Sequence, residues 1–157
     1  MTKLLKFVAA NILVVGITGF VVSIVVRLIF DGGASQRDVL VDALTFLVGV
    51  NGIMTGSGHL FSGPQVARAI GWEPSPFQWE VGLADVSCGV LGVMAGSYGR
   101  GFWLATIIAF SIFMLGAAVG HVRQMIVAHN FAPGNAGIYF WFDIIVPVAL
   151  ILLYVTL

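Results

Sequence analysis

The chain has 157 residues, of which 59% are hydrophobic and only 9% are charged, and its formal net charge is zero. Soluble domains carry about 25% charged residues, so this composition excludes an ordinary soluble protein and indicates a membrane protein. The sequence has no run of basic residues, which argues against a nucleic-acid partner.

Five long apolar segments follow one another along the chain, and each is close to the length of about 20 residues that crosses the hydrocarbon core of a bilayer. The third and the fifth segments each contain an acid, Asp85 and Asp143 respectively. Because the connections are too short to fold alone, we predict one all-α integral membrane domain, a helical bundle of about five transmembrane helices in the lipid bilayer. The predicted domain is 1–157, and its spans are about 7–30, 40–61, 79–97, 101–125 and 137–157.

The first span is expected to be a retained helix, because its apolar run exceeds the core of a cleaved signal and no convincing Ala-x-Ala site follows. The longest connection, residues 62–78, contains Pro64, Pro74 and Pro76. We predict an irregular surface loop there, in preference to a lid, with a short interfacial helix around residues 66–72. Residues 130–137 are predicted to form a plain turn.

The orientation in the membrane follows from the Lys and Arg residues near the ends of the spans. Four of them lie on the side of the N-terminus and three on the other side, which favours a cytoplasmic N-terminus and an external C-terminus. The four are Lys3, Lys6, Arg68 and Arg123, and the three are Arg27, Arg37 and Arg100.

Two Gly-His pairs, Gly58-His59 and Gly120-His121, end the second and fourth spans, and an acid follows each histidine 21 or 22 residues later. Because successive spans alternate in direction, we expect these histidines and acids at the same membrane boundary. Ionisable groups within a span are costly and normally pair inside the bundle. The predicted partners of Asp143 are His121 or Arg123, and those of Asp85 are His59 or Asn51. The candidate site residues are therefore Asn51, His59, Glu80, Asp85, His121, Arg123 and Asp143.

Several kinds of chemistry fit these residue types. The polar groups could serve only as hydrogen bonds that fix the register of the helices. His59, Glu80 and His121 could bind a transition metal, and two histidines on facing helices could be axial ligands of a haem. A further hypothesis is proton exchange with a quinol-like or lipid headgroup, because an imidazole titrates near neutral pH.

Glycine spacing predicts how the helices pack. Gly-x-x-x-Gly patterns occur in the second, third and fourth spans, at Gly52 and Gly56, Gly92 and Gly96, and Gly116 and Gly120. Such patterns allow backbones to approach closely, so we expect these three helices to form the tight centre of the bundle. The matched Gly-His pairs also suggest that spans two and three are repeated by spans four and five, about an axis along the membrane normal.

A family resemblance is carried by Gly58-His59-Leu60-Phe61 with Pro64, and by Glu80 at the start of a glycine-rich span that ends at Gly96-Ser-Tyr-Gly-Arg100. Over about residues 45–130 these motifs are similar to those of the DoxX-like family of small bacterial membrane proteins, which usually have four spans. The resemblance implies a bacterial cytoplasmic membrane and an association with membrane redox reactions, some members being linked to sulfur-compound oxidation that feeds quinone. Only His59, Glu80 and Arg100 stand at positions that match the motifs of this family, so what the resemblance implies about site residues applies to these three alone.

The leading hypothesis is a small membrane subunit whose buried pocket binds a lipid-soluble redox molecule, such as a quinone, or supports a membrane redox complex. In this hypothesis His59 and Glu80 exchange protons or hold the polar head of the ligand, His121 and Asp143 are second contacts, and Asp85 orients them. A channel or transporter for protons or cations, formed by a homo-oligomer, is one alternative. A structural assembly subunit is the other.

Overall fold

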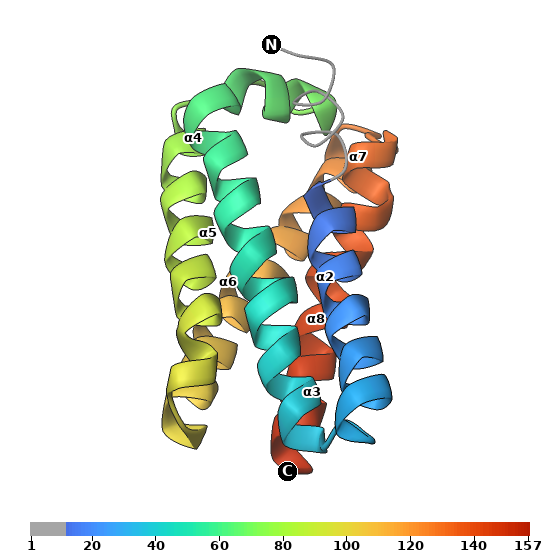
Figure 1. The fold of residues 1–157 in the computed structure, drawn as a ribbon. Helices are drawn as coiled ribbons and strands as arrows, with labels where there is room; N and C mark the ends of the chain where they lie inside the picture. The colour runs from blue at the N-terminus through green and yellow to red at the C-terminus, as the bar shows by residue number, and fades with distance from the viewer. Residues whose placement is uncertain (1–11) are drawn as a thin grey trace, which may run out of the picture.

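The computed structural model describes residues 12–157 and contains only helices, turns and loops over that range, which confirms the predicted all-α fold (Figure 1). Lys3, Lys6 and the predicted start of the first span at residue 7 lie outside the described residues. In chain order the helices are α2 (Ile12–Val26), η1 (Arg27–Asp31), α3 (Gln36–Ala43), η2 (Leu44–Val50), α4 (Asn51–Ala69), α5 (Phe77–Met94), η3 (Ala95–Ser97), α6 (Arg100–Val127), α7 (Pro133–Ala136) and α8 (Ile138–Val155).

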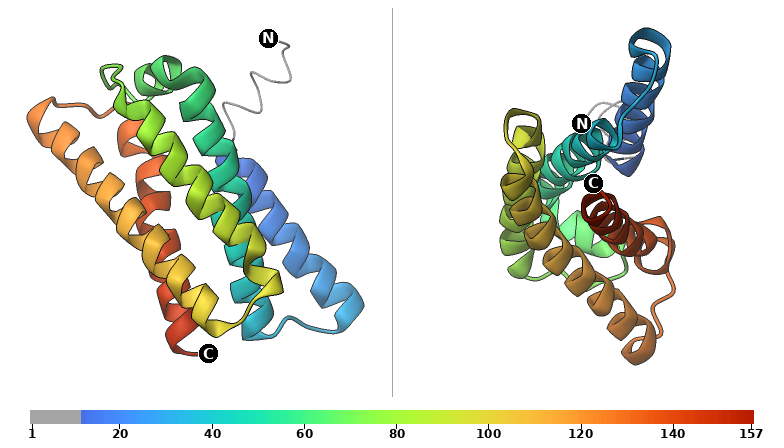
Figure 2. Two further views of the ribbon diagram at one scale, coloured as in Figure 1. Left: turned by 90° about the vertical axis from the view of Figure 1, so that its left-hand side faces the viewer. Right: turned by 90° about the horizontal axis from the view of Figure 1, so that it is seen from below.

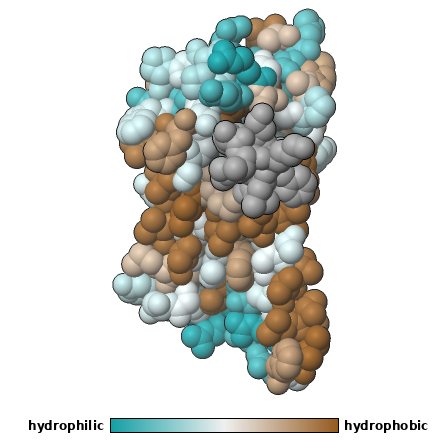
Figure 3. Space-filling view, turned by 45° about the horizontal axis from the view of Figure 1, so that its top comes forward, coloured by the Kyte–Doolittle hydropathy of each residue, from teal (hydrophilic) through white to brown (hydrophobic). Residues whose placement is uncertain are grey.

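Five helical stretches are long and apolar enough to cross a membrane, and they run side by side, with α2 at one edge of the bundle and α6 at the other (Figure 2). Hydrophobic residues form a band across the middle of the visible face and continue to the lower end on its right-hand side, whereas the top and the lower left are more polar (Figure 3). These are the features of a multi-pass membrane protein, as predicted. The five stretches are Leu13–Asp31, Gln36–Ala69, Phe77–Ser97, Arg100–Val127 and Pro133–Val155.

The first two spans form a hairpin that is held together by charged groups at its closed end. After η1 the chain turns at Gly32, whose φ of 74° lies in the left-handed region that glycine adopts without strain. Ser35 then caps α3 through a capping box, so the second span begins at Gln36, earlier than predicted. The guanidinium of Arg27 donates hydrogen bonds of 2.7 and 3.0 Å to the buried carboxylate of Asp42, which fixes α2 against α3.

Glycines allow the second and third spans to approach closely. A Cβ atom at Gly52 would lie 2.8 Å from the carbonyl oxygen of Asp85, and one at Gly92 would lie 2.5 Å from the backbone nitrogen of Gly49. The close contact of α5 with α4 and η2 therefore depends on these glycines. In the fourth span, by contrast, a Cβ atom at Gly116 would meet nothing within 4 Å. The prediction of a three-helix centre is wrong for α6, which packs mainly on α8. Its Gly116 meets no neighbouring helix, and its Gly120 lies against the side chain of Trp72.

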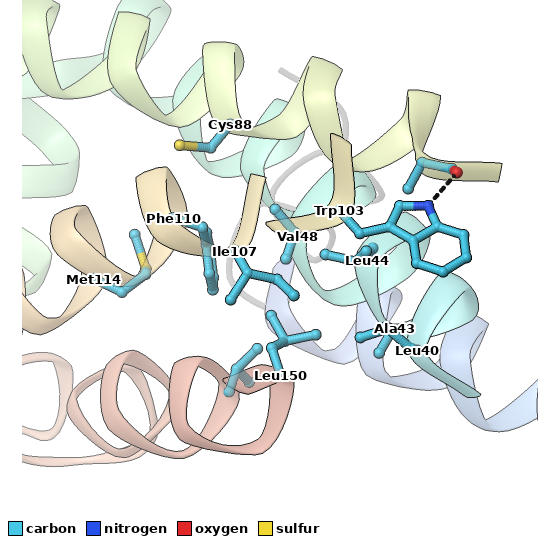
Figure 4. Packing of buried hydrophobic residues seen from close by; sticks show 12 residues of the cluster. Leu40, Ala43, Leu44, Val48, Cys88, Trp103, Ile107, Phe110, Met114 and Leu150 are labelled. Carbon is cyan, nitrogen blue, oxygen red and sulfur yellow. Dashed lines mark hydrogen bonds between the residues drawn. The ribbon is translucent and has the colours of Figure 1, made fainter. Parts of the chain in front are cut away.

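Apolar side chains from the second to the fifth spans form a packed core in the half of the bundle that holds the C-terminus (Figures 1 and 4). Leu44, Val48, Ile107 and Leu150 lie at its centre and are almost completely buried. The indole N–H of Trp103 donates a 2.8 Å hydrogen bond to a backbone carbonyl of η3, which joins α6 to the end of α5. Buried polar side chains such as Asp42 and Thr106 also lie in this half, whereas His121 and Asp143 lie towards the other end.

The opposite end of the bundle is crossed by residues 63–72, which we call the cap (Figure 1). Helix α4 is interrupted at Ser62, whose φ of −144° and ψ of 29° are not helical. Pro64 explains the break, because proline lacks the N–H of a helical hydrogen bond and its ring clashes with the preceding turn. The chain then continues as a helix to Ala69. The prediction of an irregular surface loop is therefore wrong for the first part of this connection, where the short helix starts before its predicted position.

Candidate functional site

A cavity of about 650 Å³ lies under the cap, between the α4–α5 pair and the α6–α8 pair. Its walls are mostly apolar, and the missing side chains of Gly116 and Gly120 contribute to its space. Val66, Ala69, Ile70 and Trp72 of the cap close one end. The polar residues of the lining are Asn51, Thr55, His59, Gln78, Asp85, His121, Tyr139 and Asp143.

His121 of α6 is held by a network of hydrogen bonds that reaches the cap. Asn135 of α7 is completely buried, and its side-chain oxygen Oδ1 lies 2.7 Å from Nδ1 of His121 and 2.7 Å from Nε1 of Trp72. Its amide nitrogen Nδ2 donates to the backbone carbonyls of Asn130, at 2.8 Å, and of His121, at 3.3 Å. The side chain of Asn130 in turn donates to two carbonyl oxygens at the end of the cap. The histidine, α7 and the cap are thus one connected unit.

This network determines which ring nitrogen of His121 carries a proton. An indole N–H can only donate, and Nδ2 of Asn135 faces two carbonyl oxygens, so the atom that faces Trp72 and His121 must be the amide oxygen. An amide oxygen only accepts, and Nδ1 of His121 must therefore be the donor. In a neutral imidazole with its proton on Nδ1, Nε2 keeps a free lone pair.

Nε2 of His121 faces the carboxyl group of Asp143 on α8. The distance from Nε2 to Oδ2 is 3.6 Å, which is longer than a direct hydrogen bond. Both side chains are buried and line the cavity, and neither Nε2 nor the carboxyl group has a hydrogen-bond partner within residues 12–157. Both groups can therefore hydrogen bond to the same polar atom if it approaches them from the cavity. Of the two partners predicted for Asp143, the structure brings His121 to it and not Arg123.

The other polar groups of the cavity come from α4 and α5. Nδ1 of His59 lies 2.6 Å from Oε1 of Gln78, near the cap. Asn51 and Asp85 lie deeper in the bundle and are only 2% and 5% exposed. Neither partner predicted for Asp85 bonds to it, because His59 pairs with Gln78 and both polar atoms of the Asn51 amide are unbonded.

Two predicted site residues, Glu80 and Arg123, are exposed and lie outside the cavity. Glu80 follows the cavity residue Gln78 by two positions, and Arg123 follows His121 by two positions. A step of two positions on a helix rotates the side chain by about 200°, so both side chains face away from the cavity. The position of Glu80 also corrects the hypothesis that His59, Glu80 and His121 bind a metal. Within residues 12–157 no group of three His, Cys, Asp or Glu side chains could hold a metal ion, since Glu80 is turned away from the two histidines.

Three residues that were not predicted from the sequence hold the histidines in place, namely Trp72, Gln78 and Asn135. Asn135 fell in a segment predicted to be a plain turn, yet its side chain is the centre of the network. A usable signal was present, because asparagines 130 and 135 flank Pro133-Gly134 in a chain with very few polar residues. Amides in such surroundings are expected to bond to buried backbone or side-chain groups.

A family model described as "Family of unknown function (DUF6790)" matches residues 7–157, and the chain belongs to that family. No curated protein and no solved structure matches this chain. The resemblance to the DoxX-like family is not tested by these comparisons and stays a prediction. The same holds for the bacterial cytoplasmic membrane, the orientation of the termini and the redox complex.

Proposed function

We propose that this member of the DUF6790 family binds a small lipid-soluble molecule with a hydroxyl-bearing head, of the quinol and quinone type, in the cavity under the cap. One observation carries the proposal. Nε2 of His121 and Oδ2 of Asp143 stand 3.6 Å apart without a hydrogen bond, at the wall of a cavity of about 650 Å³. A mostly apolar cavity of about 300–1,000 Å³ with a few convergent polar groups is the usual form of a small-molecule site.

A hydroxyl group in the cavity can bridge these two atoms. It can donate its proton to Nε2 or to the carboxylate, and it can accept a hydrogen bond from whichever of the two carries a proton. The apolar body of the ligand would contact aromatic lining residues such as Phe113 and Phe142. Because the bond at Nδ1 orients the imidazole before binding, little side-chain freedom is lost when the ligand arrives.

The same two groups support exchange of a proton with the ligand. A hydroxyl proton that moves to Nε2 leaves an oxygen anion on the ligand and an imidazolium beside the Asp143 carboxylate, which stabilises that positive charge. Return of the proton restores the starting state, so this step needs no electron acceptor. In this proposal His121 and Asp143 take the main role that the sequence analysis gave to His59 and Glu80.

We do not propose a path for protons or cations across the whole membrane. Such a path needs polar or charged groups along its length. Beyond the cavity the described residues form the apolar core around Leu44, Val48 and Ile107. The geometry thus favours binding and exchange at one end of the bundle.

Binding of a decyl-substituted benzoquinol to detergent-purified protein tests the proposal. We expect Asp143→Asn to weaken binding about tenfold or more, since a hydrogen bond to a charged group contributes about 1.5–3 kcal/mol. The matched control is Glu80→Gln, which changes an exposed acid outside the cavity and should leave the affinity unchanged. The proposal is refuted if the wild-type protein shows no binding by calorimetry and carries no such molecule in native mass spectrometry.

A further inference from the structure

One side of the cavity is open at the level of Gly116 in α6. Gly116 and Ile112 lie one helical turn apart, and both line the cavity although they are exposed. A Cβ atom at Gly116 would have no atom of residues 12–157 within 4 Å. The wall of the cavity is therefore interrupted at this turn of α6, and we call this place the side opening.

The side opening lies between α5 and α6. Helix α6 begins beside the end of α5 and leads away from it towards the cap (Figure 2). Val81 of α5 and Phe113 of α6 line the same cavity, so the cavity separates the two helices there. The opposite side of α6 faces α8, because Ile107 and Ile151 of α8 line a common groove. Gly116 follows Ile107 by nine positions, a rotation of about 180°, and thus points away from α8.

The depth of the side opening places it among the lipid chains. Helix α6 (Arg100–Val127) is about 40 Å long, and Gly116 lies about 24 Å from its first residue and about 16 Å from its last. The hydrocarbon core of a bilayer is about 30 Å thick, so Gly116 lies near its middle when α6 crosses the membrane. The exposed neighbours on α6, Ile108, Ile112 and Val119, are apolar. The side opening therefore faces hydrocarbon rather than water.

Two unbonded polar groups lie in the cavity on the cap side of this opening. His121 follows Gly116 by five residues, about 7–8 Å along the helix. His121 is only 7% exposed and Asp143 only 9%, and neither Nε2 nor the carboxyl group has a hydrogen-bond partner in the described part of the chain. Since buried polar groups are nearly always hydrogen bonded, this pair is an independent sign of a bound molecule. A molecule whose polar head reaches the pair can extend its apolar part to Gly116.

The cap is a less suitable exit for an apolar chain. Of the described lining residues, Ala69 of the cap is the third that is exposed. The exposed residues Arg68 and Glu73 lie close to it in the chain and make this end of the bundle polar. A long apolar chain that left the cavity there would meet polar groups and water, which the hydrophobic effect opposes.

We propose that the ligand carries a long apolar chain, which leaves the cavity through the side opening and stays among the lipid chains of the membrane. The ligand is then an amphiphile, such as a quinol with a long alkyl or polyprenyl chain, rather than a compact molecule that the cavity encloses whole. This inference rests on the proposed function and makes it more specific. It also gives a role to the Gly-x-x-x-Gly pattern of α6, because Gly116 keeps the opening free and Gly120 leaves room for Trp72.

Photochemical labelling of the wild-type protein tests the path of the chain. The probe is a decyl-benzoquinol that carries a diazirine in the middle of its decyl chain. We expect label on residues 109–119 of α6, and an excess of unlabelled decyl-benzoquinol should remove it. Label on the cap or on α2 and α8 in its place would overturn the inference, and so would the absence of any label that the quinol removes. This measurement does not depend on the folding of any variant.

A variant that fills the side opening provides the second test. We expect Gly116→Phe to weaken the binding of decyl-benzoquinol about tenfold, and to leave the binding of methyl-benzoquinol, which has no long chain, unchanged. The matched control is Gly101→Phe. Gly101 is an exposed glycine of the same helix with no described atom near its Cβ position, but it lies outside the cavity lining, so its variant should bind both probes like the wild type.

The outcomes separate this inference from the proposed function. Unchanged binding of decyl-benzoquinol by Gly116→Phe would overturn the path of the chain, and so would an equal loss for both probes. Binding of methyl-benzoquinol to the wild-type protein would leave the proposed function intact in either case. If neither quinol binds the wild-type protein, the proposed function itself fails.

Discussion

Asn135→Ala is expected to cause a large loss of stability together with a change in the chemistry of His121. The substitution removes both acceptor contacts of Oδ1, to Trp72 and His121, and both bonds donated by Nδ2. Because Asn135 is completely buried, the partners that lose these bonds can form bonds to water only at a cost in free energy.

The magnitude follows from the four bonds. Each contributes about 1 kcal/mol net, and the bond of 3.3 Å contributes least, so we expect a loss of about 3–4 kcal/mol. For a chain of this length 1 kcal/mol shifts the melting temperature by about 2–4 °C, which gives a decrease of about 6–16 °C in detergent.

Nitrogen NMR of the histidine rings provides the second measurement. In the wild-type protein the proton of neutral His121 should reside on Nδ1, whereas in Asn135→Ala both tautomers should be populated. The control is Trp72→Phe, which removes one donor to Oδ1 and leaves the bond to His121 in place. A wild-type spectrum with the proton on Nε2 and a bare Nδ1 would refute the reasoning about the network.

Two further predictions concern the packing of the spans. Gly92→Ala would place its Cβ 2.5 Å from the backbone of Gly49, about 0.9 Å inside ordinary contact at 3.4 Å, and should lower the stability by about 1–3 kcal/mol. Gly116→Ala meets nothing and should be neutral or stabilising by up to about 1 kcal/mol. Equal melting temperatures for the two variants would contradict the close contact of α5 with η2. Asp42→Leu should lower the melting temperature because it leaves Arg27 without its two hydrogen bonds. Arg27→Gln in that background should cause little further loss. If the losses of the two single variants simply add in the double variant, the two residues act independently.

The sequence was sufficient to predict the five spans and the gathering of polar groups at one end. Hydropathy determines which segments enter lipid, and the alternation of spans then brings His59, His121 and Asp143 to the same boundary. It also named His121 and Arg123 as the possible partners of Asp143, and the structure places His121 3.6 Å from it. These results depend only on length, order and polarity, all of which can be counted along the chain.

What the sequence could not supply is the rotation of each helix about its axis. A shift of two residues separates Gln78, which lines the cavity, from Glu80, which faces outward. The glycine pattern of α6 likewise does not state whether a helix or a cavity lies opposite, and here Gly116 faces open space. The burial of Asn135 depends on how α7 packs on α6, a tertiary contact that local sequence does not encode.

The cap and His121 are joined through a single atom, Oδ1 of Asn135, which receives hydrogen bonds from both Trp72 and the imidazole. Any movement of the cap that breaks the bond of Trp72 would change the number of donors at this oxygen. The oxygen would then keep one donor, the N–H at Nδ1 of His121. The position of the cap and the orientation of the imidazole in the cavity therefore depend on the same lone pairs.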